Sequence, residues 1–100
     1  MDTVTLDSFR QNRLFSGLDA SAWERVRPFL RLEDYTPGEV IFEEGDEGDS
    51  IYLIGSGAVR ISKEGRGAQQ ETLSVLGVDD HFGELAAFSL APRSARATAV

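Results

Sequence analysis

Residues with polar chemistry at close spacing lie near the end of the chain, where Gly83 and Glu84 are followed by Arg93, Ser94 and Ala95. Glycine lets the backbone approach a ligand closely, and the Glu84 carboxylate can accept a hydrogen bond from a sugar hydroxyl. Arg93 offers a fork of donors that matches two phosphate oxygens, and Ser94 adds a hydroxyl and an N–H group. Taken as one unit, these residues predict a pocket for a phosphorylated ribose.

The charge of the whole chain opposes an anionic ligand. Lys and Arg number 10 against 17 Asp and Glu, which gives a net charge of −7 over 100 residues. Attraction must therefore be local: one ion pair at about 4 Å and an effective dielectric near 20 contributes roughly 4 kcal/mol before desolvation. The same acidity removes the basic surface that DNA or RNA binding requires, so we expect no nucleic-acid contact by this segment.

Other chemistries find little support in the composition. The chain has no Cys and one His, His81, which argues against thiol nucleophiles, zinc ribbons and a metal-binding cupin-like enzyme. The acidic run from Glu43 to Asp49 lacks the residue order of a calcium loop, so we interpret it as a solvated turn. We expect no metal and no enzymatic activity. With no signal peptide and no long apolar run, the sequence also predicts a cytoplasmic protein without a membrane segment.

The first third of the chain has helical periodicity. Apolar and arginine residues recur at three- and four-residue offsets on both sides of the Ser16–Gly17 break, which predicts two short helices. The second helix has two candidate N-caps: Asp19, and Ser21, which forms a capping-box pattern with Glu24. The residues with this spacing are Leu6, Phe9, Arg10, Arg13 and Leu14 before the break, and Trp23, Val26, Phe29 and Leu30 after it.

From residue 32 onward the pattern changes to short strands separated by turns. We expect six strands, at residues 32–35, 39–43, 50–54, 58–62, 70–76 and 95–100. Short strands at such spacing indicate a small antiparallel sandwich or barrel. The run Ile51–Ile54 is apolar on both faces, so we expect it to be the most central strand. We expect Trp23, Phe29 and Phe42 in the core, and turn or bulge roles without ligand contact for the glycines Gly45, Gly48, Gly55 and Gly57.

A single helical turn is expected between the last two strands. The run Gly83–Phe88 suits such a turn, and Pro92–Ala95 returns the chain to a strand. The N–H groups at the start of a helical turn have no partner within the helix and can bind an anion. His81, just before the turn, is expected to be solvated.

Two motifs resemble those of the cyclic nucleotide-binding domain family. Phe82–Ala86 with Pro92–Ala95 resembles the phosphate-binding cassette of that family, and Gly45–Ser50 leading into Ile51–Ile54 and Gly57 resembles its other signature. The resemblance runs from about Leu14 to the end. It implies a mainly β fold with flanking short helices: an antiparallel jelly-roll barrel with a one-turn phosphate-binding helix. Residues 1–31 would form the N-terminal helices, and residues 32–100 a barrel that stops before its final strands and C-terminal helices.

The resemblance also implies roles for individual residues. Glu84 would bind the ribose 2′-hydroxyl, Arg93 the exocyclic phosphate oxygens, and Ser94 the phosphate through its hydroxyl. The N–H groups of Gly83, Leu85 and Ala95 would help to cradle the ligand, and Ala86 completes the motif. Ala87 replaces a larger aliphatic residue, which could loosen the packing under the cassette. Arg96 stands where members that favour cyclic GMP often have Thr or Ser, so cyclic AMP is the expected ligand and cyclic GMP the less favoured one.

The function implied is that of a regulatory module that senses a cyclic nucleotide. It would relay occupancy to an effector domain beyond residue 100 or to a partner protein, for instance within a transcription regulator resembling the catabolite activator family. The resemblance also allows a homodimer of the full-length protein. The alternative is a degenerate jelly roll that serves protein interaction and binds no nucleotide, against which the presence of both Glu84 and Arg93 argues.

Overall fold

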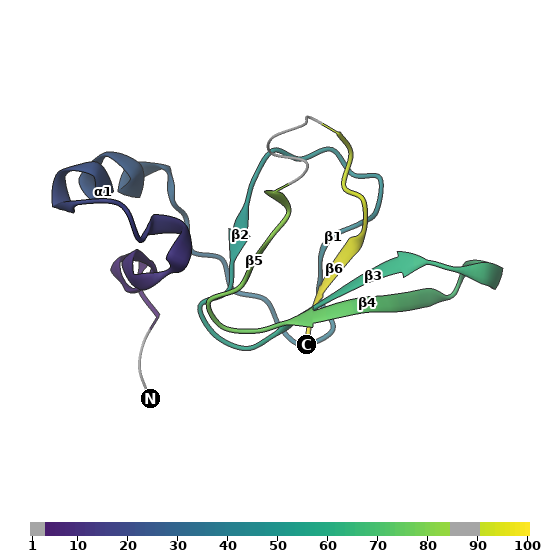
Figure 1. Ribbon diagram of the computed structural model, residues 1–100. Coiled ribbons are helices and arrows are strands. Elements are labelled where there is room, and N and C mark those ends of the chain that lie inside the picture. Colours follow the sequence, from purple (N-terminus) through teal and green to yellow (C-terminus); the bar gives the residue numbers. More distant parts are fainter. Residues whose placement is uncertain (1–3, 85–90) are drawn as a thin grey trace. The chain divides into compact units, whose positions relative to one another are not determined.

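The computed structural model describes residues 4–84 and 91–100, which fall into two compact units, Met1–Asp34 and Tyr35–Val100. The N-terminal unit is helical and the C-terminal unit is an antiparallel β structure (Figure 1).

The N-terminal unit is built from short helical segments. Three are 3-10 helices, η1 (Leu6–Gln11), η2 (Arg13–Phe15) and η3 (Arg27–Phe29), and one is an α-helix, α1 (Ala20–Val26). Of the two candidate N-caps, Asp19 starts α1: its Oδ1 accepts a hydrogen bond of 2.8 Å from the Ala22 N–H. The predicted helical character is therefore confirmed, although most segments have the tighter 3-10 winding.

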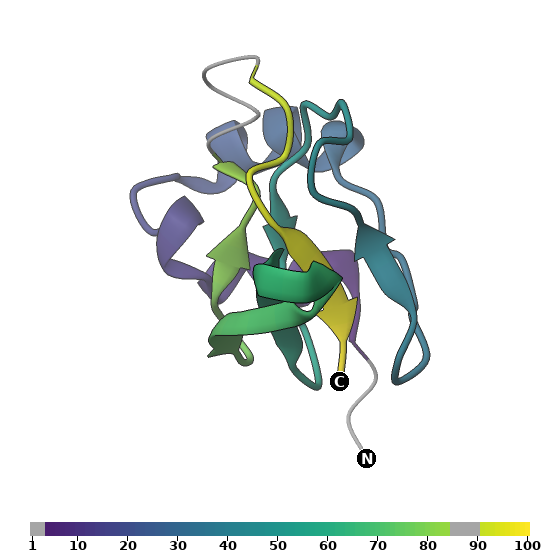
Figure 2. The same ribbon diagram turned by 90° about the vertical axis from the view of Figure 1, so that its right-hand side faces the viewer.

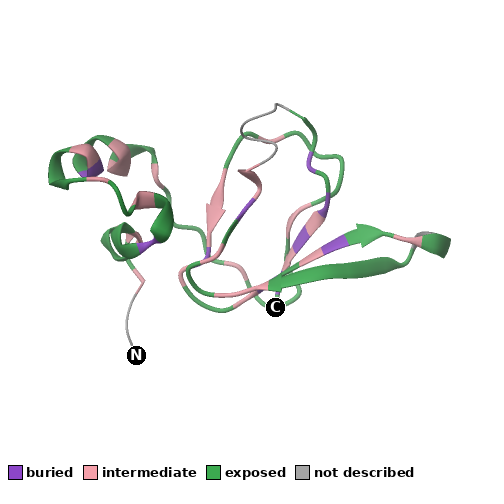
Figure 3. Cartoon of the chain, in the orientation of Figure 1, coloured by how far each residue is buried: buried purple, intermediate pink, exposed green. Residues whose placement is uncertain are grey.

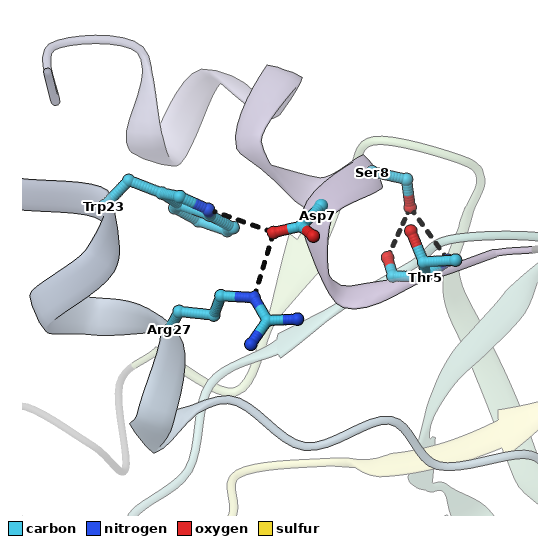
Figure 4. Close-up of polar contacts among 5 residues, drawn as sticks. All are labelled: Thr5, Asp7, Ser8, Trp23 and Arg27. Atoms are coloured by element: carbon cyan, nitrogen blue, oxygen red, sulfur yellow. Dashed lines mark hydrogen bonds and ion pairs between the residues drawn. The ribbon is translucent and has the colours of Figure 1, made fainter. Parts of the chain in front are cut away.

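Trp23 is the centre of the N-terminal unit. It is 2% exposed and its ring meets Phe15 edge to face, with centroids 5.3 Å apart. Its Nε1–H donates to Asp7 Oδ1 over 3.2 Å, and Arg27 Nε donates to the same oxygen over 2.9 Å (Figure 4). Asp7 thus joins η1 to α1 and η3. The hydrogen bond from Arg27, followed by that from Trp23, holds the pKa of Asp7 below its ordinary 3.8.

The start of η1 has its own polar contacts. The Thr5 N–H donates to Ser8 Oγ over 3.3 Å, and Ser8 Oγ donates to the Thr5 carbonyl over 2.6 Å (Figure 4). These bonds occupy groups that would otherwise lack partners at the end of a short helix.

The prediction that Phe29 lies in the core is wrong, because its side chain is 88% exposed. The helical spacing placed Phe29 on the same face as Trp23 and Val26. However, α1 ends at Val26 and the chain continues as the 3-10 helix η3. Segment η3 ends at Phe29 and the backbone of Leu30 is already extended, so Phe29 is the last residue of the helical region.

The C-terminal unit contains two antiparallel sheets. The larger has the strand order β1 (Val40–Phe42), β6 (Arg96–Ala99), β3 (Val59–Glu64), β4 (Gln70–Leu76). The smaller pairs β2 (Tyr52–Leu53) with β5 (His81–Phe82). Figure 2 shows β6, in yellow, crossing beside β1, in blue, with which it pairs. A short 3-10 turn, η4 (Arg66–Ala68), joins β3 to β4.

The core of this unit draws residues from both sheets. Its buried members are Ile54, Val59, Phe82 and Ala97. Half-buried apolar side chains pack around them, namely Ile41, Phe42, Tyr52, Ile61 and Leu76. Strand β4 contributes little, since all its residues before Leu76 are exposed (Figure 3).

Two expectations about strands are wrong. Residues 32–35 form no strand, and no described strand pairs with them; an extended segment without a ladder partner gains no sheet hydrogen bonds. The run Ile51–Ile54 is not the central strand, because β2 within it pairs only with β5 among the described residues. The inner strands of the larger sheet are β3 and β6, and β6 directs small residues, Ala97 and Ala99, inward.

Candidate functional site

The backbone of Arg93 pairs with the acidic segment that follows β1. The Arg93 N–H donates to the Asp46 carbonyl over 2.8 Å, and the Gly45 N–H donates to the Arg93 carbonyl over 2.8 Å. Gly45 has φ +89°, a conformation that favours glycine. These two bonds fix the place from which the Arg93 side chain starts, and they bring together residues that are far apart in the sequence.

The guanidinium group of Arg93 is held inside the unit, and the residue is 5% exposed. Its Nη1 donates to the Ser50 carbonyl over 3.1 Å and to the Gly83 carbonyl over 3.0 Å. Ser50 lies just before β2 and Gly83 just after β5. A single nitrogen of Arg93 therefore joins the ends of the two strands that form the smaller sheet.

An aromatic cluster lies against the guanidinium. Its Cζ is 4.3 Å from the Phe42 ring centroid and 5.7 Å from that of Tyr52, both within the range of a cation–π interaction. Tyr52 stacks on Phe82 with centroids 5.1 Å apart, and Phe42 lies 5.7 Å from Tyr52 and 5.9 Å from Phe82. The charged group thus rests on the rings that also form part of the core.

Two glycines leave room for this group. A Cβ atom built on Gly83 would lie 2.6 Å from Arg93 Nη1, and one built on Gly48 would lie 2.6 Å from Nη2 and 2.7 Å from Nε. Gly83 also has φ +86°, whereas Gly48 has no positive φ. The expectation that Gly48 serves only as a turn or bulge glycine is therefore incomplete, because a side chain there would collide with Arg93.

A cavity of about 210 Å³ opens beside Arg93. Of the seven candidate site residues, five line it: Gly83, Glu84, Arg93, Ser94 and Ala95. The other two, Leu85 and Ala86, lie outside the described residues, as do Ala87 and most of the expected helical turn. The remaining lining residues are Phe42, Ile61, Leu76, His81 and Phe82, so the lining combines polar and apolar side chains.

The cavity carries a positive group that no described carboxylate neutralises. The ion pairs among the described residues join Arg27 to Asp7, Arg31 to Glu33 and Arg96 to Glu43. Arg93 takes part in none of them. Carbonyl dipoles and aromatic rings solvate a guanidinium without cancelling its charge, so the field of Arg93 favours an anion in the adjoining cavity.

Arg96 does not line the cavity. Its neighbours Ala95 and Ala97 are buried, and strand alternation sends Arg96 to the opposite face, where its Nε donates to a Glu43 carboxylate oxygen. The expectation that Arg96 bears on the choice between cyclic AMP and cyclic GMP therefore has no support from its position.

The described residues show neither a metal-binding cluster nor a membrane-spanning helix. His81 lines the cavity and is exposed. Within residues 4–84 and 91–100, no group of three or more His, Asp or Glu side chains is placed to hold a metal ion. In the same residues, no helix is long and apolar enough to cross a membrane.

Comparison with known proteins defines the class. The family model of the cyclic nucleotide-binding domain matches residues 32–100, and the chain belongs to this family. The predicted jelly-roll fold is confirmed by solved structures of such domains. One is the regulatory domain of Toxoplasma gondii PKA, co-crystallised with cAMP, at a TM-score of 0.82 and 33% identity over 95% of this chain and 36% of that one.

Two of the relatives are regulatory proteins by name. A CRP-like cAMP-activated global transcriptional regulator of Mycobacterium tuberculosis is 34% identical over 87% of this chain and 39% of its own length. A cAMP-dependent protein kinase regulatory subunit of Debaryomyces hansenii is 32% identical over 94% of this chain and 20% of its own length. This chain therefore spans less than half of either relative. A cAMP-bound EAL enzyme shares the fold at a TM-score of 0.62 and 35% identity, over 65% of this chain and 17% of that one.

Sequence reasoning missed part of the site. Phe42, Gly48, Ser50 and Tyr52 all surround the Arg93 side chain, yet the sequence analysis gave none of them a role there. The available signal was that the Gly45–Ser50 motif and the Arg93 motif occur in one chain. Their direct contact becomes visible only when the fold brings them together.

Proposed function

We propose that the chain is a regulatory module that binds cyclic AMP in the cavity beside Arg93. The observation that carries this proposal is the buried Arg93 guanidinium, whose charge no described carboxylate pairs, at a cavity that Gly83, Glu84, Ser94 and Ala95 also line. Arg93 would bind the exocyclic phosphate oxygens and Glu84 the ribose 2′-hydroxyl. Ser94 and the N–H groups of Gly83 and Ala95 would complete the phosphate contacts. Leu85 and Ala86 would contribute from the part of the cassette outside the described residues.

The preference for cyclic AMP over cyclic GMP rests on relatives. The Toxoplasma regulatory domain was crystallised with cAMP, and the mycobacterial relative is described as cAMP-activated. We propose the same ligand for this chain, without a metal cofactor. The cavity lining offers no further observation that favours either base.

We propose that occupancy is relayed to an effector outside these 100 residues. The relatives include transcription regulators and kinase regulatory subunits, and one neighbour is an enzyme that carries such a domain. A role within a transcription regulator fits the bacterial relative. We further propose a cytoplasmic location and a homodimer of the full-length protein. With a net charge of −7, the chain itself would leave nucleic-acid contact to another domain.

A second candidate function is an interaction module that binds no nucleotide. One observation favours it: Arg93 already has structural partners in the Ser50 and Gly83 carbonyls and the Phe42 ring. On this reading Arg93 would stabilise the fold and the cavity would have no ligand.

Calorimetry separates the two functions. We expect the chain to bind cyclic AMP more tightly than cyclic GMP, 5′-AMP or the 2′-deoxy analogue of cyclic AMP. The last comparison tests Glu84, because a lost hydrogen bond to a charged group costs about 1.5–3 kcal/mol, or roughly ten- to a hundredfold in affinity. No heat with any cyclic nucleotide would reject the proposal in favour of the interaction module.

A further inference from the structure

The segment from β1 to β2 surrounds the Arg93 side chain on several sides. Phe42, at the end of β1, lies under the guanidinium, with its centroid 4.3 Å from Cζ. Ser50 accepts from Nη1, and Gly48 lies beside Nε and Nη2. Across the site, Gly83 accepts a second hydrogen bond from Nη1. We call these four residues the arginine cradle: Phe42, Gly48, Ser50 and Gly83.

Each contact of the arginine cradle restrains a different freedom of the guanidinium. The two carbonyls fix Nη1, and the face of the Phe42 ring restrains the tilt of the guanidinium plane. Nε and Nη2 form the edge of the guanidinium that lies against Gly48. A Cβ on Gly48 would lie within 2.7 Å of both nitrogens, so only glycine leaves the guanidinium room in this position.

We propose that Phe42 and Gly48 are positioning residues for phosphate binding, which act by orienting Arg93. The inference rests on the proposed function and deepens it, because it assigns the orientation of the phosphate-binding arginine to residues outside the cassette. Arginine loses side-chain freedom when it binds; a guanidinium that is already oriented loses less, and affinity rises accordingly.

The ring of Phe42 is tested by a matched pair of variants. Phe42→Leu keeps an apolar side chain but removes the π face, whereas Phe42→Tyr keeps the face. We expect Phe42→Leu to weaken cyclic AMP binding by about three- to thirtyfold, which corresponds to about 0.7–2 kcal/mol at 1.4 kcal/mol per tenfold. Phe42→Tyr should lose less affinity than Phe42→Leu, because it keeps the ring face.

Gly48 is tested by Gly48→Ala, with Gly77→Ala as its control. Gly77 has no positive φ, and a Cβ there would meet nothing within 4 Å. We expect Gly48→Ala to displace the guanidinium and weaken cyclic AMP binding by about ten- to a hundredfold, as the loss of a charged hydrogen bond would. Gly77→Ala should leave affinity unchanged, and both variants should keep the circular dichroism spectrum of the folded chain.

A spectroscopic measurement without ligand reports on Arg93 directly. The Nε-bound proton of a guanidinium that lies over an aromatic face is shifted to higher field by the ring current, and this proton is observed in proton–nitrogen-15 correlation spectra. We expect this shift for Arg93 in the ligand-free chain and in Phe42→Tyr, and its loss in Phe42→Leu and Gly48→Ala. General destabilisation alone would not move this one resonance selectively.

The outcomes separate the positioning role from the proposed function. If Phe42→Leu and Gly48→Ala leave both the Arg93 resonance and the affinity unchanged, the positioning role is overturned. If the Arg93 resonance responds as expected but the unmodified chain binds no cyclic nucleotide, the arginine cradle stands and the proposed function fails. A loss of affinity together with the resonance shift supports both.

Discussion

Arg93 combines two demands that usually conflict in a buried charged residue. Burial of a guanidinium requires partners, yet a binding group must keep donors available for its ligand. Here the partners are two carbonyls on Nη1 and the ring of Phe42. None of them is a carboxylate that a phosphate would have to displace, so fold stability and anion attraction can both come from the same side chain.

Replacing Arg93 should therefore affect affinity and stability together. We expect Arg93→Ala to weaken cyclic AMP binding by a factor of hundreds to thousands. The reason is that the buried phosphate loses the partner for its charge, which costs about 3–5 kcal/mol. The Ser50 and Gly83 carbonyls also lose a donor, so unfolding should become easier by about 1–3 kcal/mol. Calorimetry measures the first effect and urea unfolding the second.

The matched control is Arg60→Ala, which removes an exposed arginine from β3. It should change neither quantity by more than about 0.5 kcal/mol. Equal cyclic AMP affinity in Arg93→Ala and Arg60→Ala would remove Arg93 from the binding site, whereas a loss of affinity without a loss of stability would show that the carbonyl bonds contribute little.

At the scale of elements, the acidic loop between β1 and β2 does more than turn the chain. Its backbone pairs with that of Arg93 through Gly45 and Asp46, and the carbonyl of Ser50, near its end, accepts a hydrogen bond from the Arg93 side chain. The acidic side chains in the loop, by contrast, are exposed. Backbone geometry, more than side-chain charge, therefore explains why this loop and the Arg93 motif occur together.

In the N-terminal unit, Asp7 links its helical segments, and acid should loosen that link. The pKa of Asp7 in the folded chain is lowered, chiefly by Arg27, so ionised Asp7 stabilises the unit above its ordinary pKa of 3.8. This contribution is lost as the pH falls through the lowered pKa of the folded state. Unfolding followed by fluorescence of Trp23, the single tryptophan, should show the loss as the pH falls from neutral to below 3.8.

Asp7→Asn isolates the charge, because the amide oxygen can still accept from Trp23. We expect this variant to be less stable than the unmodified chain at neutral pH and equally stable at the acid end. Asp34→Asn, an equal change of charge at an exposed position of the same unit, serves as the control. A constant difference between Asp7→Asn and the unmodified chain at every pH would show that the ion pair is not the cause.

The strands that could be predicted from the sequence are those with a clear alternating or apolar run, whether their partners are near in the chain, as for β3 and β4, or far away, as for β1 and β6. β3 and β4 form a hairpin, so two alternating runs joined by a short turn are enough to predict both strands. β5 has two residues, too few for any periodicity, and it exists because it pairs with β2. The expected strand at 32–35 fails for the converse reason, since its residue pattern is suitable but no described strand pairs with it.

For the whole molecule, the polar half of the site was predictable and the apolar half was not. Gly83, Glu84, Arg93, Ser94 and Ala95 have chemical types that suggest their use, and the fold places them at one cavity. Phe42 and Tyr52 look like ordinary core residues in the sequence. Their contact with Arg93 depends on strand pairing across about half the chain, and no local pattern encodes that contact.

The net charge of −7 belongs to the whole molecule and should be visible in the salt dependence of binding. At a separation of about 13 Å, each unit charge in water interacts with an anion by roughly 0.3 kcal/mol. Seven such charges would repel the ligand by about 2 kcal/mol without screening. The Debye length falls from about 30 Å at 0.01 M salt to about 8 Å at 0.15 M, so salt weakens this repulsion.

The attraction by Arg93 should respond far less to salt, because the guanidinium is 5% exposed and acts at short range. We therefore expect cyclic AMP to bind roughly three- to tenfold more tightly at 0.15 M than at 0.01 M potassium chloride, the opposite of a protein that binds nucleic acid. Titration calorimetry at several salt concentrations measures how the affinity changes with salt. Uncharged adenosine is the reference ligand, because its affinity should not depend on salt. Affinity for cyclic AMP that falls as salt rises would mean that exposed cations dominate the attraction, and the buried Arg93 would then not be the main phosphate-binding group.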